Sequence, residues 1–169
     1  SDPGQGHPFC NNANAAVRRT LWQEQPYDEA LTGLEDLDWA RKVMARGHRV
    51  AYAAEATVVH VHSETSAQTY NRYRREGIAL KRIFPEREFG VRQLFSLTGR
   101  NVVADWAEAA RRGLLSEHAV DIPRFRLMQF WGTFRGYRQS GQVTDALRDR
   151  FYYPDRDTAA ATRDGDAGR

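Results

Sequence analysis

Pro85 divides this sequence into two segments with different apolar patterns. Upstream of it, short stretches rich in β-branched residues alternate with patterns of helical period; the stretches are 49–53 and 57–62, and the helices are 15–24, 35–46 and 66–84. Downstream, the pattern predicts amphipathic helices at 91–97, 102–112 and 124–140. We therefore expect an α/β fold with short strands in residues 1–84, a helical extension in 85–153 and a disordered tail in 154–169.

The composition narrows the class of protein. With 169 residues, 41% of them hydrophobic and 28% charged, the chain suits one globular domain or a small domain with an appendage. Cys10 is the single cysteine, which excludes an internal disulfide and favours a reducing, cytoplasmic setting. No nucleic-acid motif accompanies the net charge of +3, so we expect no nucleic-acid partner. The chain begins without methionine and is expected to come from a longer protein.

A pair of carboxylates, Glu35 and Asp36, opens the predicted helix 35–46. Beside the positive end of a helix dipole a carboxylate stays ionised. An ionised carboxylate next to a cleft can take the proton of a sugar hydroxyl while that hydroxyl attacks. The alternative is that both residues merely cap the helix, which acidic first-turn residues often do.

Two histidines and a group of arginines are the other candidates for chemistry. His60 and His62 stand two residues apart on the predicted strand 57–62, so both imidazoles face the same side and could bind one metal ion. A hydrogen-bonded structural pair is the alternative. Arg72 and Arg75 are candidate phosphate contacts, because guanidinium groups pair well with phosphate; a solvated helix face is the competing interpretation.

The order of these features resembles family-2 glycosyltransferases of the GT-A fold. The resemblance runs from Phe9 to about Phe84, about half of the chain, and matches the C-terminal, acceptor side of such a domain. Its motifs are Asn12-x-Asn14-Ala15-Ala16-Val17-Arg18-Arg19, Tyr27-Asp28-Glu29, Glu35-Asp36-Leu37-Asp38 and Val59-His60. The resemblance implies a partial, Rossmann-like GT-A fold.

The resemblance also implies roles for single residues. Asp36 would be the catalytic base, and the acceptor-binding residues would be Glu35, Asn12, Asn14 and Trp39. His60 matches a metal-ligating histidine, with His62 as a second candidate, and a Mg²⁺ or Mn²⁺ ion would stabilise charge on the leaving group. The implied reaction is inverting transfer from a nucleotide-diphospho-sugar donor to a hydroxyl of a saccharide or lipid-linked saccharide, in cell-surface polysaccharide assembly.

One departure from the family is the Asp-x-Asp motif, which should follow a buried strand. Here it occurs only within the acidic motif, at Asp36 and Asp38, and in the tail. We therefore expect the nucleotide-binding half to be missing and the chain alone to be inactive. The alternative from another class is a non-catalytic module whose basic and aromatic helices dock a partner protein or an anionic membrane surface. Peripheral contact with the inner face of the cell membrane fits both interpretations.

Overall fold

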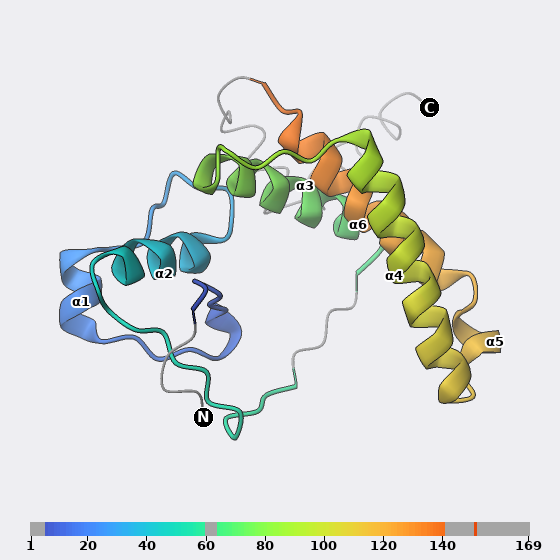
Figure 1. Ribbon diagram of the computed structural model, residues 1–169, viewed down its shortest axis with the longest axis horizontal. Coiled ribbons are helices and arrows are strands. Elements are labelled where there is room, and N and C mark those ends of the chain that lie inside the picture. Colours follow the sequence, from blue (N-terminus) through green and yellow to red (C-terminus); the bar gives the residue numbers. More distant parts are fainter. Residues whose placement is uncertain (1–5, 60–63, 141–150, 152–169) are drawn as a thin grey trace, which may run out of the picture. The chain divides into compact units, whose positions relative to one another are not determined.

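The computed structural model describes residues 6–59, 64–140 and 151 (Figure 1). Its elements are η1 Asn12–Asn14, α1 Arg19–Glu24, α2 Glu35–Ala45, α3 Ser66–Ile83, α4 Val91–Arg111, α5 Leu115–His118 and α6 Asp121–Tyr137. The chain divides into two compact units, which we call the N-terminal unit, 1–63, and the C-terminal unit, 64–169. The domain boundaries predicted after residues 84 and 153 remain predictions, and the predicted tail 154–169 lies outside the described residues.

Helix α2 supplies most of the buried apolar surface of the N-terminal unit. Trp39, Ala40 and Val43 are buried on one of its faces, as their spacing along a helix requires. The helix ends before Gly47, whose backbone has a φ of 86° and whose N–H donates to the carbonyl oxygen of Met44 at 2.9 Å. Glycine adopts that left-handed conformation without steric cost. The predicted bounds 35–46 are therefore confirmed to within one residue.

The α/β prediction, with its partial GT-A architecture, is wrong for this structure. No sheet occurs among the described residues, and the predicted strand 49–53 is an irregular segment with one isolated bridge residue, Tyr52. Thr57, Val58 and Val59 of the second predicted strand are exposed and irregular as well. Their β-branched side chains supply strand propensity, but a strand also needs a partner to complete its hydrogen bonds, and no neighbouring strand is available within the described ranges.

Glycines bring the backbones of α3 and α6 into contact in the C-terminal unit, and Figure 1 shows the two helices side by side. A Cβ at Gly136 would clash with the carbonyl oxygen of Arg74. One at Gly132 would lie 2.5 Å from another α3 carbonyl oxygen, and one at Gly77 of α3 would lie 2.7 Å from a carbonyl oxygen of α6. The two helices can approach this closely because these positions carry no side chain.

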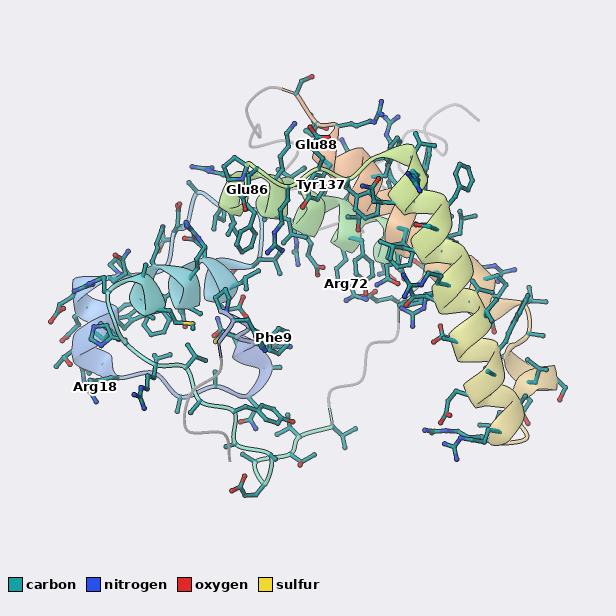
Figure 2. The ribbon with its side chains drawn as sticks, in the orientation of Figure 1. Phe9, Arg18, Arg72, Glu86, Glu88 and Tyr137 are labelled. Atoms are coloured by element: carbon teal, nitrogen blue, oxygen red, sulfur yellow. The ribbon has the colours of Figure 1, made fainter. Side chains whose placement is uncertain are left out.

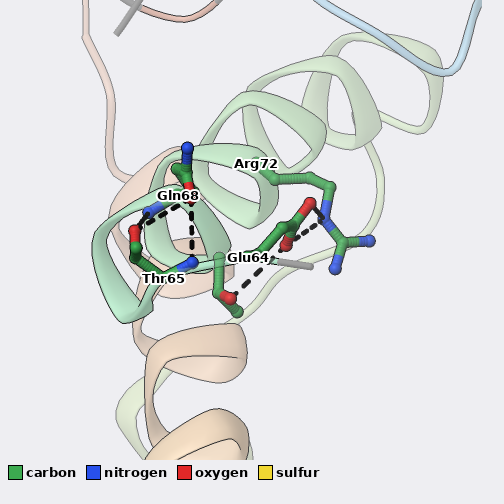
Figure 3. Close-up of polar contacts among 5 residues, drawn as sticks. Glu64, Thr65, Gln68 and Arg72 are labelled. Atoms are coloured by element: carbon green, nitrogen blue, oxygen red, sulfur yellow. Dashed lines mark hydrogen bonds and ion pairs between the residues drawn. The ribbon is translucent and has the colours of Figure 1, made fainter. Parts of the chain in front are cut away.

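Helix α3 begins with a capping box, drawn in Figure 3. The Thr65 hydroxyl accepts from the backbone N–H of Gln68 at 3.3 Å, and the Gln68 side chain accepts from the backbone N–H of Thr65 at 2.8 Å. This reciprocal pair satisfies donors that a helix N-terminus otherwise leaves without a partner. Glu64, just before the cap, accepts a hydrogen bond from Arg72 two turns along α3 at 3.0 Å. Helix α3 therefore starts at a fixed point, in agreement with the predicted helix 66–84.

Helix α4 is continuous from Val91 to Arg111, so the prediction of two helices interrupted near Gly99 is wrong. A glycine inside a helix costs only about 1 kcal/mol relative to alanine, which the rest of a long helix can outweigh. The polar side chains near Gly99 find hydrogen-bond acceptors in the backbone of the same helix. Thr98 donates to the carbonyl oxygen of Leu94 at 2.7 Å, and Asn101 donates to that of Leu97 at 2.8 Å.

Helix α6 begins at Asp121, three residues earlier than predicted, because Pro123 lies in its first turn, where no backbone N–H is needed. A bidentate ion pair, from Arg126 of α6 to Asp105 of α4 at 2.6 and 3.0 Å, joins it to α4. At its other end, Tyr137 lies beside the loop between α3 and α4, against Phe89 at 5.8 Å between ring centroids (Figure 2).

Candidate functional site

Asp36 lies in the first turn of α2, and both oxygens of its carboxylate accept backbone N–H groups. Oδ2 accepts from Asn12 at 2.9 Å, and Oδ1 accepts from the adjacent Leu37 at 2.8 Å. The side chain is half-buried, and the described residues place no cation in an ion pair with it. The carboxylate is therefore held in one orientation by the backbone while its charge remains uncompensated by any described side chain.

Tyr27 and Trp39 support the Asn12 side of this arrangement. The Tyr27 hydroxyl donates to Oδ1 of Asn12 at 3.2 Å. Its ring packs edge-on against Trp39, with 5.9 Å between ring centroids and 66° between their planes. Trp39 is 5% exposed and donates its indole N–H to the backbone carbonyl of Gln25. In this structure the predicted acceptor contact Trp39 thus fixes Tyr27, and Tyr27 fixes Asn12.

Cys10 belongs to the same group of side chains. Partial burial, followed by the negative charge of Asp36, raises the pKa of the Cys10 thiol. Burial also raises the pKa of Tyr27, and the negative charges of Cys10, Asp36 and Glu35 add to that increase, although the hydrogen bond to Asn12 opposes it. Cys10 stands two residues before Asn12, and Asn12 contacts Asp36 through its backbone N–H and Tyr27 through its side chain.

Leu34, the residue before the acidic pair, adopts a left-handed backbone conformation with φ 58° and ψ 27°. A bulky residue in this region costs about 1–3 kcal/mol, and such strain concentrates at functional sites. The chain makes this turn after three buried residues, Leu31, Thr32 and Gly33. The strained turn sets the direction in which Glu35 and Asp36 leave the loop.

The other predicted acceptor residues lie in the same unit. Glu35 is half-buried beside Asp36, and Asn14 is exposed with its side-chain amide donating to the carbonyl oxygen of Ala56 at 2.6 Å. Asp38, the second carboxylate of the Asp-x-Asp pattern, is 3% exposed and pairs with Lys42 at 2.6 Å and with Arg41 at 3.2 Å. Asp38 therefore pairs with cations of α2, whereas Asp36 is held by backbone N–H groups of η1 and of the first turn of α2.

The predicted metal ligands, His60 and His62, lie outside the described residues. Within the described ranges, no three histidine, cysteine, aspartate or glutamate side chains form a group that could hold a metal ion. The metal site therefore remains a prediction.

Arg72 and Arg75, the candidate phosphate contacts, belong to the C-terminal unit. Arg72 pairs with Glu64 at 2.9 Å (Figure 3). Its guanidinium also lies over the ring of Tyr73, 4.5 Å from the ring centroid. Arg75 is half-buried in α3. The guanidinium of Arg72 is thus already paired in this structure, and a phosphate would have to compete with a carboxylate for it.

Sequence reasoning gave no role to Cys10, Tyr27 or Leu34. Tyr27 belongs to the motif Tyr27-Asp28-Glu29, which contributed to the family resemblance, but the motif indicated no function for the tyrosine itself. Cys10 enters the sequence analysis only as the single cysteine, because its position relative to Asp36 depends on how the chain between them folds. Nothing in the sequence marks the left-handed conformation of Leu34, since glycine is the residue normally expected there.

Comparison with curated proteins found similar enzymes. Over 71 residues, 41% of this chain, it is 37% identical to the O-antigen chain rhamnosyltransferase RfbN of Salmonella typhimurium and 34% identical to the O-antigen chain rhamnosyltransferase WbaN of Salmonella anatum. The matched segment spans 23% and 22% of these two proteins. No family model and no solved structure matches the chain. The similarity is thus to named glycosyltransferases and covers a minor part of each.

Proposed function

We propose that this chain forms the acceptor side of a family-2-like glycosyltransferase in which Asp36 is the catalytic base. The observation that carries the proposal is the state of Asp36: a half-buried carboxylate, oriented by two backbone N–H groups and without a described counterion. The similarity to two enzymes named rhamnosyltransferases supports the same class of reaction.

In the proposed reaction, Asp36 accepts the proton of an acceptor hydroxyl as its oxygen attacks the anomeric carbon of the donor sugar. The bond from that carbon to the nucleotide diphosphate breaks, and the configuration inverts. A general base of this kind contributes typically about 10²- to 10⁴-fold to the rate. The backbone N–H of Asn12 holds one carboxylate oxygen in place, and the other oxygen is held by the first turn of α2.

The names of the two relatives favour a nucleotide-activated rhamnose as donor and a growing polysaccharide, free or lipid-linked, as acceptor. Glu35 and Asn12 are proposed acceptor contacts, since Glu35 adjoins Asp36 in the chain and Asn12 contacts it. Asn14, two residues after Asn12, is the third proposed contact. The donor-binding region is proposed to lie outside this chain. The proposed location is cytoplasmic, at the inner face of the cell membrane.

A divalent cation, Mg²⁺ or Mn²⁺, is proposed as cofactor, with His60 or His62 as its ligand from this chain. When bound, it would supply positive charge beside the diphosphate leaving group. Both histidines lie outside the described residues, and no step of the proposed mechanism depends on the ion.

The proposal is tested in the enzyme that contains this chain, by comparing Asp36→Asn with Glu24→Gln. Asparagine keeps an oxygen for the Asn12 N–H but cannot accept the proton, so kcat should fall by about 100-fold or more. Glu24 forms an exposed ion pair with Arg46 at 3.0 Å, and its neutralisation should leave turnover unchanged. Equal turnover in both variants would remove Asp36 from the chemistry.

A further inference from the structure

Helix α4 carries two apolar stripes, and only one of them is buried. Leu94, Val102 and Ala109 are between 4% and 8% exposed and form the buried stripe. The second, which we call the exposed stripe of α4, consists of Phe95, Val103 and Trp106, which are 70%, 64% and 38% exposed. These positions recur at helical spacing and share one face with Gly99. Packing among the described residues therefore leaves Phe95 and Val103 open, and Trp106 partly open, since its indole N–H donates to the carbonyl oxygen of Ala119 at 3.1 Å.

The charge on this face is positive. Arg92 and Arg100 lie along the exposed side of α4, are exposed, and form no ion pair within the described ranges. The two carboxylates of the helix, Asp105 and Glu108, each already accept a hydrogen bond of 2.6 Å from an arginine. The segment 64–140 as a whole has 14 basic and 8 acidic residues. The apolar stripe is thus bordered by two free cations and by no free carboxylate of its own helix.

We propose that the exposed stripe of α4 docks on an anionic lipid bilayer surface. Apolar and aromatic side chains flanked by arginines are the combination that places a helix in the plane of a membrane interface, with the rings among the acyl chains and the cations at the headgroups. A second copy of this chain fits the face less well, because it would bring the same arginines against one another. The proposal uses no residue of the Asp36 site, so it stands or falls independently of the proposed transfer reaction.

The test is sedimentation of the 169-residue chain with vesicles of phosphatidylcholine, alone and mixed with phosphatidylglycerol. The chain should bind the mixed vesicles, and binding should weaken with added salt, as screened charges require. Each arginine near such a surface contributes about 1 kcal/mol, so Arg92→Gln with Arg100→Gln should lower the partition coefficient by roughly 25-fold. Phe95→Ser should lower it by roughly 10-fold through lost apolar burial.

Matched variants of exposed residues in the N-terminal unit serve as controls. Arg18→Gln with Arg19→Gln removes the same charge as the double arginine variant of α4. Phe9→Ser makes the same substitution as Phe95→Ser. These should bind as the unmodified chain does, and all variants should keep the same circular dichroism spectrum. Three results would overturn the proposal: no binding to the mixed vesicles, an equal loss in the control variants, or a concentration-dependent dimer that Phe95→Ser makes monomeric without any vesicle binding.

Discussion

The two units of this protein are stabilised in different ways. In the N-terminal unit, α2 is the main source of buried apolar side chains, and the loops around it are fixed by polar contacts such as the Asn12 N–H to Asp36. In the C-terminal unit, long helices pack so closely that glycines place one backbone against another. Polar contacts that orient a loop suit a site where a carboxylate must stay accessible, whereas close helix packing suits a scaffold. Substitutions in each unit should therefore fail in different ways.

The largest effect on stability should come from Gly136→Leu in the C-terminal unit. A side chain there meets the α3 backbone, which cannot move aside as a flexible side chain could, so we expect a loss of about 1–3 kcal/mol in the free energy of unfolding. Urea denaturation followed by circular dichroism at α-helical wavelengths measures it.

Gly99→Ala is the matched control, because a Cβ at Gly99 has no atom within 4 Å in the described structure. Alanine is the better helix former, and the variant should gain up to about 1 kcal/mol. If Gly136→Leu proved as harmless as Gly99→Ala, the close contact of α3 and α6 would not be the main source of stability in this unit.

The reactivity of Cys10 reports on the charge of Asp36 without any measurement of transferase activity. Because Asp36 helps to raise the pKa of the thiol, Asp36→Asn should lower that pKa and increase the thiolate fraction at neutral pH. We expect alkylation by iodoacetamide to become several-fold faster at neutral pH, because the thiolate is the form that reacts. Glu24→Gln should leave the rate unchanged. An unchanged rate in Asp36→Asn would mean that the two side chains do not lie together.

Tyr27→Phe should have the smallest effect, and it tests the support of Asn12. It removes one exposed hydrogen bond, worth about 0.5–1.5 kcal/mol, so turnover of the enzyme that contains this chain should fall only a few-fold. The pKa of Tyr27 is raised, so the hydroxyl remains protonated in the folded chain above the ordinary value near 10. Its contribution to stability is complete below that pH and is lost as the pH rises through the raised pKa. The stability difference between the two proteins should accordingly shrink in alkali; a constant difference would contradict this role.

Much of the helical structure could be predicted from local pattern. The acidic pair marked the start of α2, its predicted end at residue 46 is one residue from the observed end, and the predicted helix 66–84 corresponds to α3. Signals of this kind work because the hydrogen bonds of a helix connect near neighbours in the chain. The interruption predicted near Gly99 was wrong. Glycine is a local helix-breaking signal, but the buried residues on both sides of it hold α4 as one continuous helix.

The strands show the limit of such patterns. Residues 49–53 have the composition of a strand, but whether they form one depends on a partner elsewhere in the chain, and none is present among the described residues. The candidate site likewise contains residues that local pattern predicts and residues that only the fold brings in. Glu35 and Asp36 were found because a helix start is a local feature, whereas Cys10 and Tyr27 join Asp36 only through loops.

The sequence by itself determined where α2 and α3 begin and which carboxylates open α2, because caps and periodicity act within a few residues. The tertiary structure decided the rest: that Asn12 reaches across to Asp36, that Leu34 adopts a left-handed turn, and that α4 buries one stripe and exposes another. These outcomes depend on contacts between residues far apart in the chain, and their free energies appear only when the whole chain packs.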